Sequence, residues 1–385
     1  MRLYLIYLVF TSLILNANEE VEVLSDTKKQ ILNLEQKQIE QKAISNQFDY
    51  LGEINLNGSY TTNQDELDTQ DYSISFSQDI FNFGGITSQI EYAKELKKLE
   101  LLNLTIERKD DLNSLYELII NIKLNEIALK QNRLNLKNSE IEIRNKKSQY
   151  KAGDLDISDL NDAIMTKNQL SDKKKELELT KLININEIKK FTDKDYKTIL
   201  LPQLQLISKE LFLKNSTSIN YAQVNINVDE NLYKMKKSDY YPTIGINGAY
   251  GYNDTNKAIG DDYYNYGMSI SLPLSYTALS NIEQKKLDFL ISKQELREAV
   301  IENTLLYDST LMTISNYNDR IKLAQEDISL YNELLIMNQE EYKAGYKTID
   351  DVETLQNSQD IRALDIQSYK LNIQKEMLTI YFKML

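Results

Sequence analysis

The chain contains no histidine, no cysteine and no tryptophan. Without histidine or cysteine it has no Ser-His or Cys-His catalytic pair and no His/Cys metal site. The lack of cysteine also excludes disulfides and lipid attachment through a thiol. Only carboxylate, lysine, tyrosine or Ser/Thr chemistry is left, so we expect no catalytic residue, no metal and no cofactor.

Proline and glycine are also scarce, with 3 and 11 residues among 385. The prolines Pro202, Pro242 and Pro273 avoid the segments with a helical pattern. So few helix breakers favour very long helices. The net charge of −13 argues against nucleic acid as a partner, because phosphates are neutralised by Lys and Arg.

Residues 1–17 have the pattern of a signal peptide. Arg2 precedes an apolar run from Leu3 to Leu15, and Ala17 offers a small residue for cleavage. The run is shorter than the roughly 20 residues of a membrane helix, although an uncleaved N-terminal anchor is the alternative. No later stretch is apolar enough to span a membrane as a helix, so a membrane-embedded chain would need a β-barrel.

Two pairs of segments, 52–80 and 243–274, alternate apolar and small polar residues. Period-2 alternation indicates strands with one apolar and one polar face. Tyrosines gather near the strand ends, as they do at the membrane boundaries of β-barrels. A soluble, half-buried sheet is the alternative. Because four strands cannot close a barrel, the membrane interpretation requires several chains, each contributing its sheet.

The chain is a tandem duplication of about 190 residues. Tyr150-Lys151-Ala152-Gly153 recurs as Tyr342-Lys343-Ala344-Gly345. We therefore predict two repeats, 18–200 and 201–385. The first contains a helix, the strand pair 52–80, a long helix 86–150 and a returning helix 155–190. The second contains a helix, the strand pair 243–274, a long helix 280–342 and a returning helix 347–383. Each repeated glycine suits a helix C-terminus.

Apolar residues recur at every seventh position of both long helices, which indicates coiled-coil packing. The first seam consists of Leu115, Ile122, Leu129, Leu136, Ile143 and Tyr150, repeated as Tyr307, Ile314, Ile321, Ile328, Leu335 and Tyr342. A second seam lies two residues away, on nearly the opposite flank: Ile120, Ile127, Leu134 and Ile141, then Leu323, Leu330 and Met337. Two opposed seams favour a wall in which each helix has a neighbour on both sides; a bundle helix with one broad apolar side is the alternative.

This arrangement resembles the TolC-like outer-membrane efflux protein family over nearly the whole mature chain. The resemblance rests on the two Tyr-Lys-Ala-Gly turns, on the Ile-x2-Leu/Val pattern after each, and on Ser75 to Gly85 as the exit from strand to helix. It implies a mainly α fold with β: a long coiled-coil α-barrel and four strands per chain that contribute to a 12-stranded transmembrane β-barrel in a homotrimer. It also implies outer-membrane lipid around the barrel and a tunnel into the periplasm.

The resemblance further implies a passive exit duct of a tripartite efflux or type I secretion system, not an enzyme. The implied partners are a periplasmic adaptor (membrane fusion) protein and an inner-membrane transporter of the RND, ABC or MFS type. The implied periplasmic tip, where adaptors dock, contains Tyr150, Gly153, Tyr342 and Gly345. The implied gate contains Tyr346, Asp350, Asp351 and Glu353. The alternative for the acids is ordinary helix-start charge, which is also our interpretation of Asp154, Asp156 and Asp159 in the first copy.

Two other functional classes are open. A trimeric outer-membrane anchored adhesin also donates four strands per chain, but normally as one C-terminal block. An exported carboxylate enzyme such as a glycoside hydrolase would need two acids about 5–10 Å apart in a concave pocket, and no motif of that kind is present.

Overall fold

The computed structural model describes residues 22–64, 68–256 and 258–385. The predicted signal peptide lies outside these residues. The chain divides into two compact units. Unit 1 comprises the described residues up to Leu32, Ile106–Asn215 and Asn303–Leu385, and unit 2 comprises Asn33–Thr105 and Ser216–Glu302.

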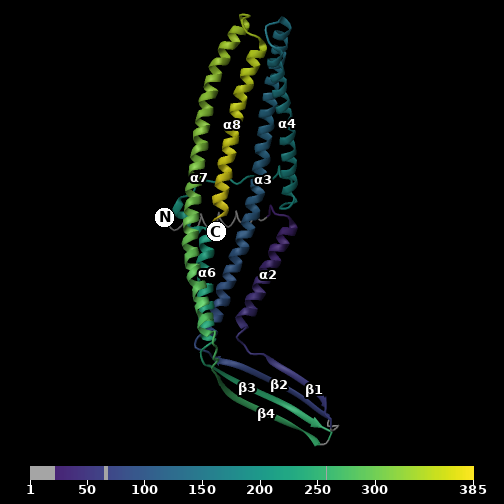
Figure 1. Cartoon of the computed structure of the whole chain (residues 1–385), viewed down its shortest axis with the longest axis vertical. Coiled ribbons are helices and arrows are strands. Elements are labelled where there is room, and N and C mark those ends of the chain that lie inside the picture. The colour runs from purple at the N-terminus through teal and green to yellow at the C-terminus, as the bar shows by residue number, and fades with distance from the viewer. Residues whose placement is uncertain (1–21, 65–67, 257) are drawn as a thin grey trace, which may run out of the picture. The chain divides into compact units, whose positions relative to one another are not determined.

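The elements follow the same order in both halves of the chain (Figure 1). The first half contains α2 (Asp26–Phe48), β1 (Ile54–Thr62), β2 (Asp68–Phe81), α3 (Gly85–Ala152) and α4 (Ile157–Ile188). The second contains α5 (Lys209–Asn215), α6 (Thr217–Ser238), β3 (Thr243–Thr255), β4 (Ala258–Ser271), α7 (Ala278–Lys343) and α8 (Ile349–Phe382). The predicted element types are therefore confirmed, and both long helices match the predicted ranges to within two residues at each end. The division into repeats at residue 200 stays a prediction.

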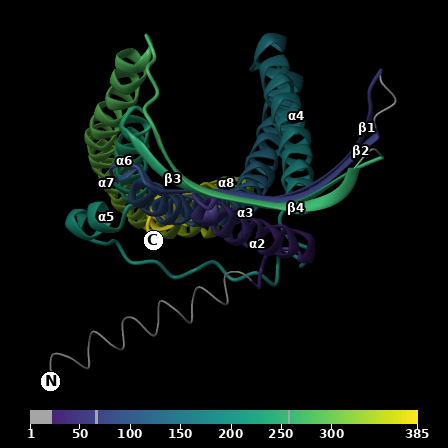
Figure 2. The ribbon, with the colours of Figure 1, turned by 90° about the horizontal axis from the view of Figure 1, so that it is seen from below.

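Unit 2 contains a four-stranded antiparallel sheet in the order β1-β2-β3-β4, which curves strongly in Figure 2. The register places residues of one kind in rows across the sheet. Leu56 is opposite Ile74, Ile74 is opposite Tyr250, and Tyr250 is opposite Tyr264. The next row holds Asn55, Ser75, Ala249 and Asn265. Because opposite residues share a face, the sheet has the predicted apolar face and polar face.

The apolar face is not covered by the described part of the chain. Exposed side chains on it include Leu56, Tyr72, Ile74, Phe76, Tyr250, Tyr264, Tyr266, Met268 and Ile270. A continuous apolar surface of this kind marks contact with another apolar phase or partner. No helix within the described ranges is long and apolar enough to cross a membrane.

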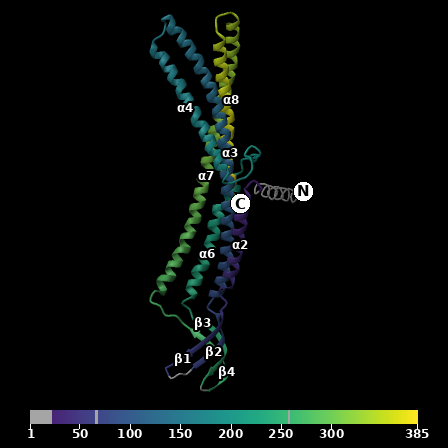
Figure 3. The same cartoon turned by 90° about the vertical axis from the view of Figure 1, so that its right-hand side faces the viewer.

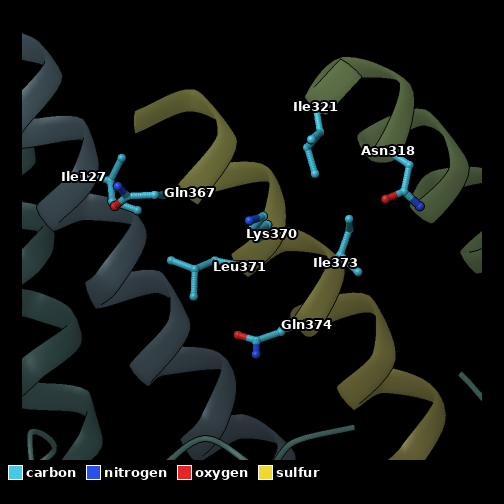
Figure 4. A pocket seen from close by; sticks show the side chains of 8 residues that line it. All are labelled: Ile127, Asn318, Ile321, Gln367, Lys370, Leu371, Ile373 and Gln374. Carbon is cyan, nitrogen blue, oxygen red and sulfur yellow. The ribbon is translucent and has the colours of Figure 1, made fainter. Parts of the chain in front are cut away.

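In unit 1, α3 is packed on two sides. Lys181 of α4 pairs with Glu126 of α3 at 2.7 Å, and Gln131 of α3 donates to Asp365 of α8 at 2.8 Å. Figure 4 shows α8 passing between α3 and α7, with Ile127 and Ile321 on either side of Leu371. The helix order is therefore α4-α3-α8-α7, a layer in which the middle helices have two neighbours.

This order explains how the predicted seams are buried. On α3 both seams contain fully buried residues, including Leu115, Ile120 and Ile122. On α7 the first seam is covered at Tyr307, Ile314 and Leu335. The second seam of α7 is open, because Leu323, Leu330 and Met337 are 60%, 56% and 57% exposed. At the other end of the layer, α4 exposes a comparable set: Ile164, Met165, Leu179, Leu182 and Ile183.

An extended segment after α4 completes the core of unit 1. Leu201 and Leu204 pack against the cluster around Leu115, Ile119 and Leu378. Farther along, Phe212 of α5 is fully buried against Tyr307 and Ile380. Tyr307 also donates its hydroxyl hydrogen to the carbonyl of Ile207 at 2.6 Å, so the ring is fixed at both its apolar and its polar end.

Ile122 offers a test of the packed α3 seam, since its side chain is 0% exposed. We expect Ile122→Ala to lower the free energy of unfolding by about 2–5 kcal/mol, through lost burial and the cavity left behind. Lys130→Ala, at an exposed position of the same helix, should change it by less than about 0.5 kcal/mol. Urea unfolding followed by circular dichroism measures both, and equal effects would contradict the packing of α3.

Candidate functional site

The two repeated turns of unit 1 end their helices with the same backbone geometry. Gly153 and Gly345 both have φ of +83°. The N–H of Gly153 donates to the carbonyl of Tyr150 at 3.1 Å, and that of Asp154 donates to Gln149 at 3.0 Å. In the second copy Gly345 donates to Tyr342 at 3.0 Å, and Tyr346 donates to Glu341 at 2.9 Å. These are Schellman motifs, and the positive φ explains why both copies have glycine.

Figures 1 and 3 show the two turns at the same end of unit 1, the α3–α4 turn apart from the α7–α8 turn. Tyr150 and Tyr342, which the resemblance assigns to the tip, are both exposed. Tyr346 is 84% exposed. The turns therefore present three aromatic side chains to the surroundings of unit 1.

The helices restart differently in the two copies. In the first, Asp156 is the N-cap of α4, and its carboxylate accepts from the Ser158 N–H at 3.0 Å. In the second, Thr348 and Asp351 form a capping box at the start of α8. Asp351 accepts from the Thr348 N–H at 2.9 Å and from its hydroxyl at 2.8 Å. The hydrogen bonds from Thr348 hold the pKa of the Asp351 carboxyl below its usual value.

The three acids predicted for the gate thus have different surroundings. Asp351 caps its own helix. Asp350 pairs with Arg144 of α3 at 2.9 Å, which connects the two hairpins. Glu353 is exposed, and within the described part of the chain no hydrogen bond or ion pair holds it. No group of three or more acids in the described ranges is arranged to hold a metal ion.

A groove of about 850 Å³ adjoins these acids and is lined by all four helices of the layer. Asp351, Lys347 and Glu142 contribute charges to it, and asparagines contribute amides. The Ser139 side chain also lines it, and its buried hydroxyl has no partner among the described residues. The groove therefore combines these polar groups with the apolar side chains of Ile141, Leu170 and Leu355.

Sequence reasoning missed Arg144 as a site residue. It lies far from Asp350 in the chain, and the pattern around it differs in no way from that of other exposed helix positions. Lys347 and Thr348 were also missed. A Ser/Thr followed three residues later by an acid is a capping signal, so Thr348 and Asp351 were recognisable as a pair.

Comparison with known proteins gives a family match for the second half of the chain. Residues 209–382 match the family model described as outer membrane efflux protein. The similarity to this family thus covers the second half of the chain. No curated protein matches the chain in sequence.

The whole chain has the fold of solved outer membrane proteins and channels. The outer membrane protein VceC of Vibrio cholerae is 13% identical, with a TM-score of 0.71 over 90% of this chain and 92% of VceC. The Campylobacter jejuni CmeC outer membrane channel is 13% identical, with a TM-score of 0.75 over 96% and 85%. The Neisseria gonorrhoeae MtrE outer membrane channel, solved in its open state, is 14% identical, with a TM-score of 0.69 over 94% and 86%. The resemblance inferred from the sequence is confirmed.

The capping box predicts a pH dependence for the stability of the second half of the chain. The folded-state pKa of Asp351 is depressed, so its contribution is fully present above the unfolded pKa of about 3.9 and is lost as the pH falls through the lower, folded value. We expect Asp351→Asn to lower the free energy of unfolding by at most about 1 kcal/mol above pH 5, because the cap is exposed. The difference should shrink below about pH 4.

Urea unfolding at a series of pH values measures this difference. Glu353→Gln is the control, since that side chain makes no described contact. A difference between Asp351→Asn and the parent that stays constant from neutral pH to about pH 2 would show that the carboxylate does not cap α8.

Proposed function

We propose that three copies of this chain form an outer-membrane channel-tunnel that serves as the passive exit duct of a transport system. The observation that carries the proposal is the incompleteness of a single chain. One face of the sheet is apolar and exposed, and the sheet has β1 and β4 as its edges. At the ends of the helical layer, α7 and α4 expose apolar side chains.

The apolar face of the sheet suits the lipid of the outer membrane. Its rows alternate with Ser, Asn and Gly on the opposite face, which is the pattern of a strand with lipid on one side and water on the other. A membrane-spanning sheet cannot leave its edge N–H and C=O groups unpaired. Pairing of β1 in one copy with β4 in the next gives 12 strands from three copies, which is enough to close a barrel.

The end helices of the layer, like the sheet edges, need a neighbour from another copy. The open seam of α7, consisting of Leu323, Leu330 and Met337, needs an apolar neighbour that the chain itself does not supply. The exposed apolar residues of α4 on the next copy provide one. A closed wall then buries both end helices and leaves polar faces outside and inside, so the interior is a wet duct.

Leu330 tests the wall, since its side chain is 56% exposed in one chain. We expect Leu330→Asp to fold as a chain but to lose most of the trimer, because an unpaired charge would be buried at every junction between copies. Ser329→Asp places the same charge one residue away at an exposed position and should leave the trimer intact. Analytical ultracentrifugation in detergent measures the oligomer, and equal trimer fractions for the two variants would refute the wall.

The turns suit docking of a periplasmic adaptor. Tyr150 and Tyr342 are exposed three residues before Gly153 and Gly345, and the Schellman motifs hold these four residues in matching positions. An adaptor docked there would join the duct to an inner-membrane transporter of the RND, ABC or MFS type. A small-molecule efflux system and a type I secretion system both fit this duct.

The acids at the start of α8 suit a gate in which three copies approach one axis. Glu353 is the acid without a described partner, so it contributes most to the field of the duct in our proposal. Asp350 contributes when its ion pair with Arg144 opens. Tyr346 is four residues before Asp350, in the bend between α7 and α8, and its side chain is exposed. An acidic ring raises the local concentration of cations and repels anions.

Neutralising the ring tests both the duct and the gate. In planar bilayers the parent trimer should conduct and should prefer cations. The triple variant Asp350→Asn, Asp351→Asn, Glu353→Gln should lower the cation preference by about threefold, and Glu353→Gln alone should account for most of that change. The measurement is the reversal potential in a salt gradient.

Asp159→Asn is the control for the triple variant, because it removes an exposed acid at the corresponding position of the first repeat. It should leave the reversal potential unchanged. A triple variant with the parent's selectivity would mean that the three acids are helix-start charges only. Absence of any conductance from a folded parent trimer would refute the duct itself.

A further inference from the structure

The connection from β2 to α3 contains a strained residue. Phe83 has φ of +52° and Gly84 has φ of +94°, and Phe83 is the one non-glycine residue in the described chain with positive φ. The N–H of Gly85 donates to the carbonyl of Asn82 at 3.1 Å. A hydrogen bond from residue i+3 back to residue i, enclosing two residues with positive φ, is typical of a type I′ turn.

The turn explains its other residues but not Phe83. Asn82 accepts from the Ile86 N–H at 2.8 Å and caps the helix. A Cβ on Gly85 would lie 2.2 Å from the Ser238 hydroxyl, so a larger residue there would force the Ser238 and Asn82 side chains to move. Asn, Asp and Gly are the residues that the first central position of this turn favours, and an aromatic residue with positive φ is an outlier. The ring of Phe83 must therefore contribute something that the backbone does not require.

The ring belongs to an interfacial cluster that consists of Phe81, Phe83 and Tyr241. Its centroid lies 4.9 Å from that of Phe81 and 5.6 Å from that of Tyr241. These contacts leave the Phe83 side chain 53% exposed, and Phe81 and Tyr241 are exposed as well. The exposed half of the cluster is therefore accessible to a partner outside the chain.

The charges next to the cluster identify that partner. The residues of the four strands include no lysine or arginine. The cations that precede β3 in the chain are on the last turn of α6, where Lys237 lies 5.8 Å from the ring centroid of Tyr241. Lys237 is exposed, and no carboxylate in the described ranges lies within ion-pair distance of it. Lys236, in contrast, pairs with Asp239 at 3.1 Å.

We propose that the interfacial cluster and Lys237 form a binding site for the anionic headgroup of a phospholipid, at the boundary where the apolar face of the sheet ends. The site rests on the proposed function, because it needs the sheet to lie in a membrane. Phe83 and Phe81 insert beside the acyl chains, and the Lys237 ammonium binds the phosphate. The occupant is lipid rather than protein, because Phe81 is the last residue of β2 and the cluster continues the exposed apolar surface of the sheet.

Tryptophan fluorescence gives a direct test, since the chain has no tryptophan of its own. In the reconstituted trimer, the Phe83→Trp indole should be quenched by brominated phosphatidylglycerol more than by brominated phosphatidylcholine. The relative binding constant should favour phosphatidylglycerol by about fivefold, the effect of one lysine near an anionic lipid. Lys237→Gln should bring this ratio to about one.

Lys234→Gln is the matched control, because Lys234 lies on the same helix and is already paired with Glu230 at 2.7 Å. It should leave the ratio unchanged. The proposal would be overturned if the Phe83→Trp variant showed no quenching, or if Lys237→Gln left the ratio of binding constants unchanged. An emission change caused by inorganic phosphate alone, in detergent, would reassign the site to free phosphate and overturn it as well.

Met268→Trp separates this proposal from the proposed function. Met268 is on the exposed apolar face of the sheet, so its replacement should be quenched by either brominated lipid if the sheet spans a membrane. Without that quenching the proposed function fails. With it, but without quenching of the Phe83→Trp variant, the headgroup site alone fails.

The turn itself provides a second measurement, with Tyr241→Trp as the reporter. Adding Phe83→Asn supplies a residue that the turn favours, so the thermal midpoint should stay the same or rise. Quenching of the reporter by brominated phosphatidylglycerol should fall. A lower midpoint would show that Phe83 has a folding role only, and the headgroup site would be rejected.

Discussion

The backbone N–H and C=O groups along the outer sides of β1 and β4 have no partner strand within the sheet of one chain. In water such edges are tolerated, but beside an exposed apolar face they are costly, because a nonpolar phase offers no hydrogen bonds. The helices are also incomplete in a single chain: α7 leaves its second seam, including Leu330, exposed, whereas α3 buries its seams. In the proposed channel both deficits have the same remedy, a second copy that presents the opposite edge of the same structure.

The two duplicated turns have the same backbone geometry, but different charged residues follow it. Gly153 and Gly345 end their helices with the same φ and the same hydrogen bonds. The residues that follow differ, since Asp156 caps α4 alone whereas Thr348 and Asp351 cap α8 reciprocally. The second copy adds the ion pair from Asp350 to Arg144, which ties the two hairpins together. The repeats thus preserve the bend, while the charges around it have diverged.

Positive φ has a different meaning at the turns and at the sheet. At Gly153 and Gly345 it costs little, because glycine has no Cβ. At Phe83 it is strained, whereas the corresponding turn of the second repeat, Ser275 to Ala278, has Tyr276 at that position without positive φ. Both repeats therefore have an exposed aromatic ring at this position, and only the first has it on a strained backbone. Strain kept at an exposed residue points to a contact outside the chain.

The sequence by itself determined the element types, the two faces of each strand and the glycine bends. These depend on short-range rules: period two in strands such as Ile74 and Phe76, period seven in helices, and positive φ at Gly153 and Gly345. Only the tertiary structure decided which seam is covered, that Arg144 meets Asp350, and that Phe83 is strained beside Tyr241. Those outcomes depend on which helix lies beside which and on the register between distant segments, and local periodicity carries no information about either.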